Sequence, residues 1–363
     1  MNKIGKNVVT QQMVADAAGV HLSTVSLALR NAPRIPEETK AHIRQTAEKL
    51  GYQPNPLVSM LMARVRRGDS GYRGTLGFLH TAEADLPKLQ THQHRNFLLG
   101  ARARAKELGY NLDEFFLPKT ERLVRQFMRM LSTRSIHGLV IEFVPGPSCP
   151  DRRLPFDCAP FAVASLGMPL ASPQLHYVAN DQYMRAVLAG QHLLELGYKR
   201  IGLVIDSTFD RLMAHRCSAG FWALQHYTQG IDVLPILQLD RGNLGSLKGW
   251  LDEHRPEAVL GTSLHSLEEM RRLGLTVPDD VGWAHLDWLP EHKRVAGVYG
   301  NSEHTGAAAV ELVVSQLHRG EAGPPSRAMN YLVAGSWMPG KTLRKVGPPI
   351  DLDSTFFGSL AAL

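Results

Sequence analysis

Residues 9–31 of the chain read VTQQMVADAAGVHLSTVSLALRN, and two short helical patterns meet within this stretch. In the first pattern Thr10 is placed to cap a helix, and Val14 and Ala17 recur at the spacing of an inward face. Gly19 follows, and glycine readily adopts the positive φ that turns a chain out of a helix. The pattern therefore predicts a helix followed by a sharp turn.

The second pattern predicts a helix over residues 22–29, with Val25 and Leu29 four positions apart on its buried face. Four side chains are left facing outward, those of Leu22, Ser23, Ser26 and Leu27. Two helices joined in this way are typical of a helix-turn-helix, whose second helix reads the major groove of DNA. An ordinary helical hairpin packed on a larger domain is the alternative interpretation.

A third helix is expected directly after these two. Pro36 and two glutamates indicate its start and Gly51 its end, and Ile43, Ala47 and Leu50 recur at helical spacing between them. Three short helices over residues 1–54 would form one small headpiece.

The charge of the chain supports a DNA-binding headpiece. Residues 1–68 contain ten lysines and arginines against four aspartates and glutamates, a net charge of +6, and the whole chain is also +6. The positive charge is therefore concentrated in the amino-terminal part, where a polyanion would bind.

Another short helix is expected after Asn55, which can cap it, with Pro56 at its first position. At roughly nine residues it is shorter than an isolated helix that is stable in water, so it needs a partner helix or DNA. A segment rich in glycine and charge follows, and residues 55–73 are predicted to form this helix and a linker.

Residues 8–68 resemble the DNA-binding headpiece and hinge helix of the lactose-repressor (LacI) family of bacterial transcription regulators. The resemblance is carried by V-T, the A-x-x-A-G-V turn, S-T-V-S, R-I-P-E-E-T and L-G-Y-x-P-N, in this order and spacing. It implies a homodimer that binds a pseudo-palindromic operator in double-stranded DNA. It also implies a set of DNA-contacting positions: Thr10, Leu22, Ser23, Thr24, Ser26, Leu27, Arg30, Asn31, Arg34, Asn55 and Leu61.

By the same resemblance Leu61 falls at the hinge leucine that inserts into the central base step and kinks the duplex. Packing between two hinge helices is the alternative role for this residue. Leu27 departs from the family pattern, since a polar residue often stands there, and His21 replaces a common capping serine. Leucine can contact a thymine methyl group but cannot form a bidentate pair with guanine, so the operator sequence stays open.

The rest of the chain, about 290 residues, is long enough for two further α/β lobes. Strand-like apolar runs alternate with amphipathic helical patterns from Gly74 onward, and E-L-G-Y recurs at 107–110 and 195–198. Such alternation predicts doubly wound parallel sheets covered by helices on both faces. We therefore expect an α/β fold with a three-helix headpiece, a hinge helix and two parallel-sheet lobes with an effector cleft between them.

The resemblance extends over about residues 8–345 and implies a core similar to periplasmic sugar-binding proteins, and hence a small-molecule effector, by analogy a sugar. We expect this core over 74–345. The first lobe is expected at about 74–175 plus 295–323 and the second at about 176–294 plus 324–345. The tail, residues 346–363, is not explained by the resemblance.

Effector contacts are expected where strands end, because open α/β sheets hold ligands at the carboxyl ends of their strands. Asp287 matches the family's acidic effector contact, and an aspartate can accept hydrogen bonds from sugar hydroxyl groups while Trp288 offers an apolar face. The alternative is that Asp287 caps a turn and Trp288 belongs to the core. The candidates are His80, Thr81, Glu83, Glu142, Asp206, Arg216, Asp287 and Trp288.

Arg216 lies one residue away from the position where the family usually has an arginine, and Cys217 stands at the matching place. One residue rotates a side chain by about 100° around a helix, so this assignment is the weakest of the set.

Several classes of protein do not fit the sequence. No apolar run approaches 18 residues and no secretory signal opens the chain, so neither a membrane protein nor a secreted one is expected. Three cysteines without a Cys-x-x-Cys motif, Cys149, Cys158 and Cys217, suggest neither a disulfide framework nor a zinc site. We expect a cytoplasmic protein.

No phosphate-binding loop, dinucleotide fingerprint or nucleophile elbow occurs, and no cofactor, metal or enzymatic activity is expected. His92 and His94 could be drawn with His80 or Asp85 as metal ligands, but a polar loop and helix start is the simpler interpretation. The competing class is a sugar-binding module, or a glycoside-acting enzyme in which acids such as Glu142 and Asp287 form a hydrolytic pair, with an incidental helical N-terminus.

Overall fold

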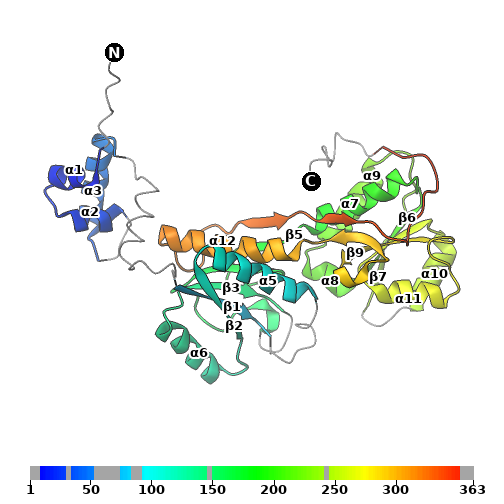
Figure 1. Cartoon of the computed structure of the whole chain (residues 1–363), viewed down its shortest axis with the longest axis horizontal. Coiled ribbons are helices and arrows are strands. Elements are labelled where there is room, and N and C mark those ends of the chain that lie inside the picture. The colour runs from blue at the N-terminus through cyan, green and yellow to red at the C-terminus, as the bar shows by residue number, and fades with distance from the viewer. Residues whose placement is uncertain are drawn as a thin grey trace, which may run out of the picture. The chain divides into compact units, whose positions relative to one another are not determined.

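The computed structural model describes residues 9–29, 34–52, 74–82, 92–144, 149–240 and 245–351. Contacts divide the chain into two compact units, Met1–Arg73 and Gly74–Leu363, each of which folds around its own core (Figure 1). The expected hinge helix and linker over 55–73 lie outside the described residues, as does the end of the tail beyond residue 351.

Within the described residues, the first unit contains three helices that pack against one another: α1 (Gln11–Ala18), α2 (Leu22–Leu29) and α3 (Glu37–Lys49). The Thr10 hydroxyl accepts a hydrogen bond from the Met13 N–H and caps α1, and Gly19 ends it with a φ of +67°. The core between the helices consists of Val14, Ala15, Val25, Ala28, Ile43 and Ala47.

Three apolar positions of this unit differ from the expectation. Ala17 is exposed, and Ala15 takes the inward place beside Val14. Leu29 is half-buried, while Leu50 follows the last turn of α3 and stays 37% exposed. Each of the three helices buries a narrow stripe because a core this small contacts only two or three positions per helix.

In the second unit, one six-stranded sheet has the order β11-β5-β4-β3-β1-β2, with all neighbouring strands parallel. Its strands are β1 (Gly74–His80), β2 (Tyr110–Phe116), β3 (Gly138–Glu142), β4 (Ala162–Leu166), β5 (His176–Asn180) and β11 (Asn330–Val333). Two helices, α5 (His92–Glu107) and α12 (Ser302–Arg319), share a core with one face of this sheet, and α6 (Glu121–Thr133) shares a core with the other. Alternate residues of β1 follow this division, with Phe78 in the first core and Leu79 in the second.

A second six-stranded sheet has the order β12-β10-β9-β8-β6-β7 and is parallel except for β12, which runs antiparallel to β10. Its strands are β6 (Ile201–Asp206), β7 (Leu237–Leu239), β8 (Ala258–Gly261), β9 (Gly282–Trp288), β10 (Ala296–Tyr299) and β12 (Ser336–Met338). Helices α7 (Gln182–Glu195) and α9 (Arg216–Tyr227) pack on one face, and α10 (Gly245–His254) and α11 (Leu264–Arg272) on the other. The remaining helical elements are α8 (Ser207–Leu212) and the 3-10 turns η2 (Pro150–Arg152) and η3 (Pro290–His292).

The prediction of two doubly wound, parallel-sheet lobes is confirmed. The expected lobe boundaries are wrong: β5, placed in the second lobe, belongs to the first sheet, and β10, placed in the first lobe, belongs to the second sheet. The segment assigned to the second lobe after 323 is itself divided, because β11 joins the first sheet and β12 the second. Membership of a sheet is decided by hydrogen bonds to strands far away in the chain, which local patterns do not report.

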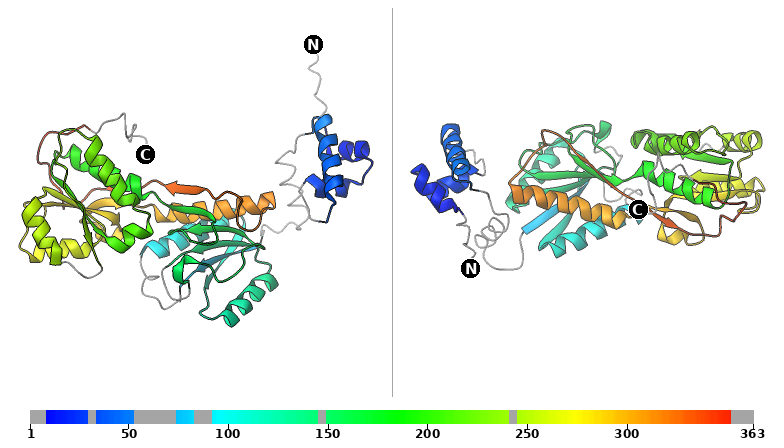
Figure 2. Two further views of the ribbon diagram at one scale, coloured as in Figure 1. Left: turned by 180° about the vertical axis from the view of Figure 1, so that it is seen from behind. Right: turned by 90° about the horizontal axis from the view of Figure 1, so that it is seen from above.

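The chain consequently crosses between the sheets three times, after Asn180, after Tyr299 and after Val333. Figure 2 shows the last crossing as the orange-red segment that passes from one lobe to the other. None of the helices within the described ranges is long and apolar enough to span a membrane.

Candidate functional site

The outward face of α2 is the candidate nucleic-acid surface of the first unit. Leu22 is 39% exposed and Ser23 is also exposed, while Thr24, Ser26 and Leu27 are half-buried. Val25 and Ala28 point into the small core and hold the helix in place. The exposed set therefore combines an apolar side chain with hydroxyl groups, which suits contacts with thymine methyl groups and base edges.

His21 takes over the capping role at the start of α2. Its Nδ1 accepts a hydrogen bond from the Ser23 N–H at 3.3 Å and lies 2.8 Å from the Ser23 hydroxyl oxygen. An imidazole nitrogen can satisfy a free N–H of the first turn as a serine oxygen would, so the departure from the family pattern leaves the helix capped.

The other predicted DNA contacts are only partly visible. Thr10 is exposed and caps α1, and Arg34 is exposed with no ion pair within the described part of the chain. Arg30, Asn31, Asn55 and Leu61 lie outside the described residues.

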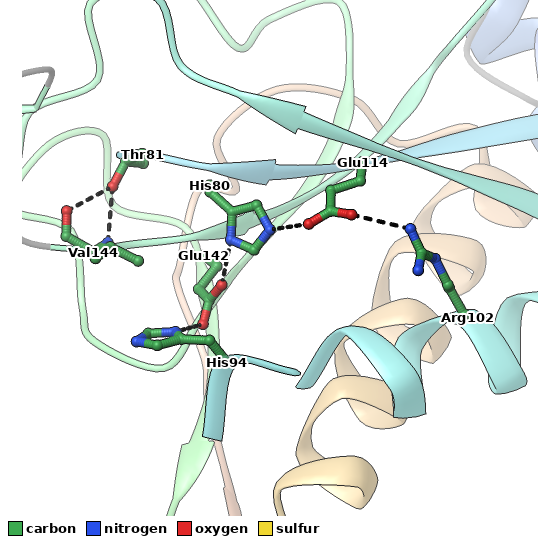
Figure 3. Close-up of polar contacts among 7 residues, drawn as sticks. All are labelled: His80, Thr81, His94, Arg102, Glu114, Glu142 and Val144. Carbon is green, nitrogen blue, oxygen red and sulfur yellow. Dashed lines mark hydrogen bonds and ion pairs between the residues drawn. The ribbon is translucent and has the colours of Figure 1, made fainter. Parts of the chain in front are cut away.

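In the first lobe, the carboxyl ends of β1 and β3 meet in a polar cluster whose central residues, His80 and Glu142, are buried (Figure 3). The His80 Nδ1 lies 2.6 Å from the Glu142 Oε2, and its Nε2 lies 2.9 Å from the Glu114 Oε1. The second oxygen of Glu142 accepts a hydrogen bond from His94 Nδ1, and the second oxygen of Glu114 accepts one from Arg102 at 3.0 Å. We call these five residues the strand-end cluster.

The geometry of the strand-end cluster fixes its charges. Because both His80 nitrogens face carboxylate oxygens, the ring is an imidazolium that donates on both sides. Burial lowers the pKa of His80, but the hydrogen bonds and charges of Glu142 and Glu114 outweigh it and raise this pKa above its usual value. Burial likewise raises the pKa of Glu142, but His94 and His80 outweigh it and hold this pKa below its usual value.

The two remaining candidates in this lobe are Thr81 and Glu83. Thr81 is fully buried, and its hydroxyl donates to the Val144 carbonyl oxygen at 3.2 Å and accepts from the Val144 N–H at 2.9 Å. Thr81 therefore ties the end of β1 to the chain after β3. Glu83 lies outside the described residues.

In the second lobe, the end of β9 carries an ion pair. The Arg185 Nη1 donates to the Asp287 Oδ1 at 3.0 Å. The Nε and Nη2 of this buried guanidinium have no hydrogen-bond partner within the described residues. Trp288, the next residue, is only 6% exposed and its indole N–H donates to the Val295 carbonyl at 2.9 Å, so it belongs to the core and presents no open face for a sugar ring.

Asp206 and Arg216 lie at the starts of two helices of the same lobe. Asp206 accepts a hydrogen bond from the Phe209 N–H at 2.7 Å and caps α8. Arg216 begins α9 and is half-buried. Cys217, at the position where the family usually has an arginine, is fully buried, and burial raises the pKa of its thiol to about 12.

Polar contacts connect the two lobes where the chain crosses between them. The Gln93 amide in the first turn of α5 donates to Asn180 at 3.5 Å, and the Asn180 amide donates to the Gly300 carbonyl and, at 3.3 Å, to the Thr305 hydroxyl. A Cβ at Gly300 would lie 2.1 Å from the Arg185 Nη2 and 2.6 Å from the Asn180 Nδ2, so a larger residue there would displace these side chains. These contacts hold the start of α5, the end of β5 and the chain after β10 together.

Eight residues of this arrangement were not predicted from the sequence: Gln93, His94, Arg102, Glu114, Asn180, Arg185, Gly300 and Thr305. A charged residue within an otherwise buried helical stripe signals a buried ion pair, and Arg185 stands between buried positions of α7 in this way. The sequence predicts a polar loop and helix start at His94, and this residue does lie in the first turn of α5, where its Nδ1 donates to Glu142.

Two surface cavities of the described residues, of about 540 and 520 Å³, lie elsewhere. The first is lined by residues that precede β8 and β9, among them Pro256 and Val281, and the second by α6 and the chain before β4. Neither includes a strand-end residue of the candidate site. No group of three metal-ligating side chains occurs within the described ranges, and the three cysteines are buried free thiols.

These features agree with known proteins. A family model described as bacterial regulatory proteins, lacI family, matches residues 11–55. The HTH-type transcriptional repressor CytR of Escherichia coli (strain K12) is 23% identical over 350 residues, which cover 90% of this chain and 96% of CytR.

Solved structures show the same fold. The lac repressor dimer bound to operator and the anti-inducer ONPF has a TM-score of 0.54 and 18% identity, covering 93% of this chain and 99% of that one. The transcriptional regulator CelR–cellobiose complex has a TM-score of 0.54 and 18% identity, covering 92% and 99%. Residues 11–55 therefore match the helix-turn-helix of the lacI family, and the chain shares the two-lobe fold of these solved structures.

Proposed function

We propose that the chain is a homodimeric repressor that binds a pseudo-palindromic operator and whose affinity for DNA is set by a sugar bound between its two lobes. The observation that carries this proposal is the pairing of an outward-facing α2 with two parallel sheets joined by three chain crossings. The first feature suits base contacts, and the second suits a ligand that binds at the strand ends.

The sugar is supported by a neighbour of the same fold that is described as a complex with cellobiose. The dimer and the operator are supported by a second neighbour, a lac repressor dimer bound to operator. Asp287 is the acceptor we assign to a sugar hydroxyl from the second lobe, because its side chain is partly exposed and only one of its oxygens accepts from Arg185. Leu61 keeps the proposed role of kinking the operator.

In this proposal the ligand controls DNA affinity because the two lobes can close on each other in two different ways. A sugar that binds one closure more tightly shifts the chain toward it, and the shift is limited by the difference in affinity, typically about 1–3 kcal/mol of coupling. The three crossings after Asn180, Tyr299 and Val333 are the places where a change of lobe angle would be absorbed.

The test measures operator affinity by fluorescence anisotropy, using a duplex selected by the full chain from genomic fragments, with and without cellobiose. We expect tight binding that cellobiose or a related neutral sugar changes by about tenfold or more, as 1.4 kcal/mol of coupling requires. Binding that no sugar alters would refute the effector part of the proposal and leave the DNA-binding part standing.

A further inference from the structure

We propose that residues 352–363, which we call the end segment, pair as an added strand with the outer edge of β11 in the same molecule. β11 belongs to the sheet of the first lobe, whereas the chain before the end segment is bound to the second lobe. The pairing therefore ties the two lobes together. This inference does not depend on the proposed function or on a ligand.

The outer edge of β11 is the first observation. β11 is the last strand of its sheet and pairs with β5 alone within the described residues. The carbonyls of Met329 and Val333 each accept a hydrogen bond at 2.9 Å from the β5 side. Because alternate residues of a parallel strand bond to the same neighbour, the N–H and C=O groups of Asn330 and Leu332 point away from β5. β11 thus presents two donors and two acceptors along its outer edge.

The side chains of this edge are apolar and exposed. Residues 328–334 read AMNYLVA and carry no charge. Three large side chains on or beside the strand are exposed: Met329 (48%), Tyr331 (40%) and Leu332 (38%). Natural edge strands usually carry charges, prolines or bulges that prevent pairing with another strand. An uncharged apolar edge is instead typical of a strand that another segment covers.

The opposite edge of the same sheet shows the protected arrangement. Its strand, β2, carries Asp113 and Glu114, and these acids form ion pairs with Arg134 and Arg102. A strand added there would have to accommodate these charges. The two edges of the first sheet therefore differ in chemistry, and the β11 edge is the one suited to a further strand.

The end segment starts close enough to reach this edge. The described chain ends one residue after Ile350, whose N–H donates to the Leu194 carbonyl near the end of α7. At the other end of α7, the Asp181 N–H donates to the Val333 carbonyl of β11. Asp181 and Leu194 lie about 20 Å apart at roughly 1.5 Å per helical residue. Residues 352–363 can extend to about 40 Å, so half of them suffice to reach Val333.

The remaining half can run along β11 in the antiparallel direction, because it arrives at the Val333 end of the strand. Residues 354–363 read STFFGSLAAL and carry no charged side chain, so no charge opposes pairing with the uncharged edge. A segment tethered to the same molecule has an effective concentration of roughly mM. This favours the chain's own end segment over the β11 of a second copy at micromolar concentrations.

Hydrogen exchange measured by mass spectrometry on the full chain tests the pairing. We expect the outward N–H groups of Asn330 and Leu332 to exchange at least tenfold more slowly in wild type than in a chain carrying Leu360→Pro and Ala361→Pro. Neighbouring N–H groups of a strand point to opposite sides, so one of these prolines removes a donor to β11. The matched control Leu360→Ala keeps both donors and should keep the protection.

Equally fast exchange of these two amides in wild type and in the proline variant overturns the proposal. Slow exchange that survives both prolines also overturns it, because the edge would then be covered by something else.

Disulfide trapping identifies which molecule supplies the added strand. Leu332→Cys is combined in turn with Ser359→Cys, Leu360→Cys and Ala361→Cys, and the full chain is oxidised at micromolar concentration. Residues that exchange both hydrogen bonds in an antiparallel pair have Cα atoms about 5.5 Å apart, which suits a disulfide. The native cysteines are buried free thiols.

We expect at least one combination to form a disulfide within one chain, seen as a faster-migrating monomer on a non-reducing gel. Leu332→Cys with Val233→Cys, an exposed position of the second lobe, is the control that should form none. Disulfides only between chains assign the edge to a second copy and overturn the proposal. The absence of any disulfide in all three combinations overturns it as well.

Discussion

Arg185 and Asp287 form an ion pair that is unequally buried: the Arg185 side chain is 1% exposed and the Asp287 side chain 31%, with 3.0 Å between Nη1 and Oδ1. Asp287 is the only hydrogen-bond acceptor of the guanidinium within the described residues, because Nε and Nη2 have no partner there. The arginine therefore depends on the aspartate, while the aspartate can still be hydrated and can turn one oxygen outward.

Because the two side chains are unequally buried, replacing Arg185 and replacing Asp287 should lower the free energy of unfolding by different amounts. Asp287→Ala leaves a buried cation without an acceptor and should lower the free energy of unfolding by about 2 kcal/mol, reduced from the fully buried case because Asp287 is partly hydrated. Arg185→Met should cost less, since the remaining carboxylate reaches water. Urea unfolding of both variants checks the order, and equal costs, or a larger cost for Arg185→Met, would contradict it.

Asp287→Ala also tests whether Asp287 contacts the ligand. Asp287→Ala should abolish the response to a sugar while operator affinity without sugar stays within about twofold, because the headpiece carries the DNA contacts. Asp287→Asn, which keeps an oxygen acceptor for Arg185, separates loss of the ligand contact from loss of fold. A response retained at the same sugar concentration in Asp287→Ala would place the ligand elsewhere.

The strand-end cluster predicts a pH dependence of stability with a defined sign. The pKa of His80 is raised above 6.5, so its contribution is complete below pH 6.5 and is lost as the pH rises through the raised value. The pKa of Glu142 is lowered below 4.5, so its contribution is present above pH 4.5 and is lost as the pH falls through the lowered value. The two together favour a maximum between about pH 4.5 and 6.5.

Unfolding in urea across pH 4 to 9 measures this dependence. Compared with wild type, His80→Gln should lose the decrease on the alkaline side, while the exposed-residue control His265→Gln should keep it. Parallel curves for wild type and His80→Gln above pH 6.5 would show that His80 is not held as an imidazolium.

Gly300 predicts a matched pair of glycine substitutions. In Gly300→Ala the new methyl group would lie 2.1 Å from the Arg185 Nη2 and 2.6 Å from the Asn180 Nδ2, so these buried side chains must shift and stability should fall by about 1–3 kcal/mol. Gly249→Ala, inside α10 with open space around it, should be neutral or gain roughly 0.5–1 kcal/mol. Thermal unfolding of both variants compares them, and equal effects would mean that the Gly300 crossing is not tightly packed.

Substitutions on α2 should change either the stability of the headpiece or its affinity for DNA, depending on whether the side chain is buried or exposed. Leu22→Ala removes an exposed side chain and should change unfolding by less than about 0.5 kcal/mol while costing about 1–3 kcal/mol of specific affinity. Val25→Ala, at a fully buried position on the same helix, should instead destabilise the headpiece. Unchanged affinity in Leu22→Ala, measured on the selected duplex, would remove this residue from the DNA-contacting surface.

Local signals were sufficient for most helices and strands. The second helix was predicted over 22–29 and is found there, and the third, expected between Pro36 and Gly51, is α3 (Glu37–Lys49). Capping residues, glycine stops and helical periodicity act over a few neighbouring positions, so a single sequence reports them.

Long-range pairing was not predictable in the same way. His94 and Glu142 are 48 residues apart and Arg185 and Asp287 are 102 apart, and no local pattern relates them. Candidates chosen as strand ends, such as His80, Glu142 and Asp287, did fall on strand ends. Which of their polar atoms remain free for a ligand depends on hydrogen-bond partners that are distant in the sequence and are brought together only by the fold. Trp288 illustrates this, because its neighbour Asp287 is partly exposed while Trp288 itself is buried.

The most direct test of DNA-binding regulation is a selection of genomic fragments by the purified full chain, compared with a chain lacking residues 1–68, at physiological salt and against random competitor DNA. We expect the full chain to enrich a small set of fragments that share a pseudo-palindromic sequence, and the shortened chain to enrich none while it still folds. A full chain that prefers no fragment, or a shortened chain that selects the same fragments, would contradict sequence-specific binding by the headpiece.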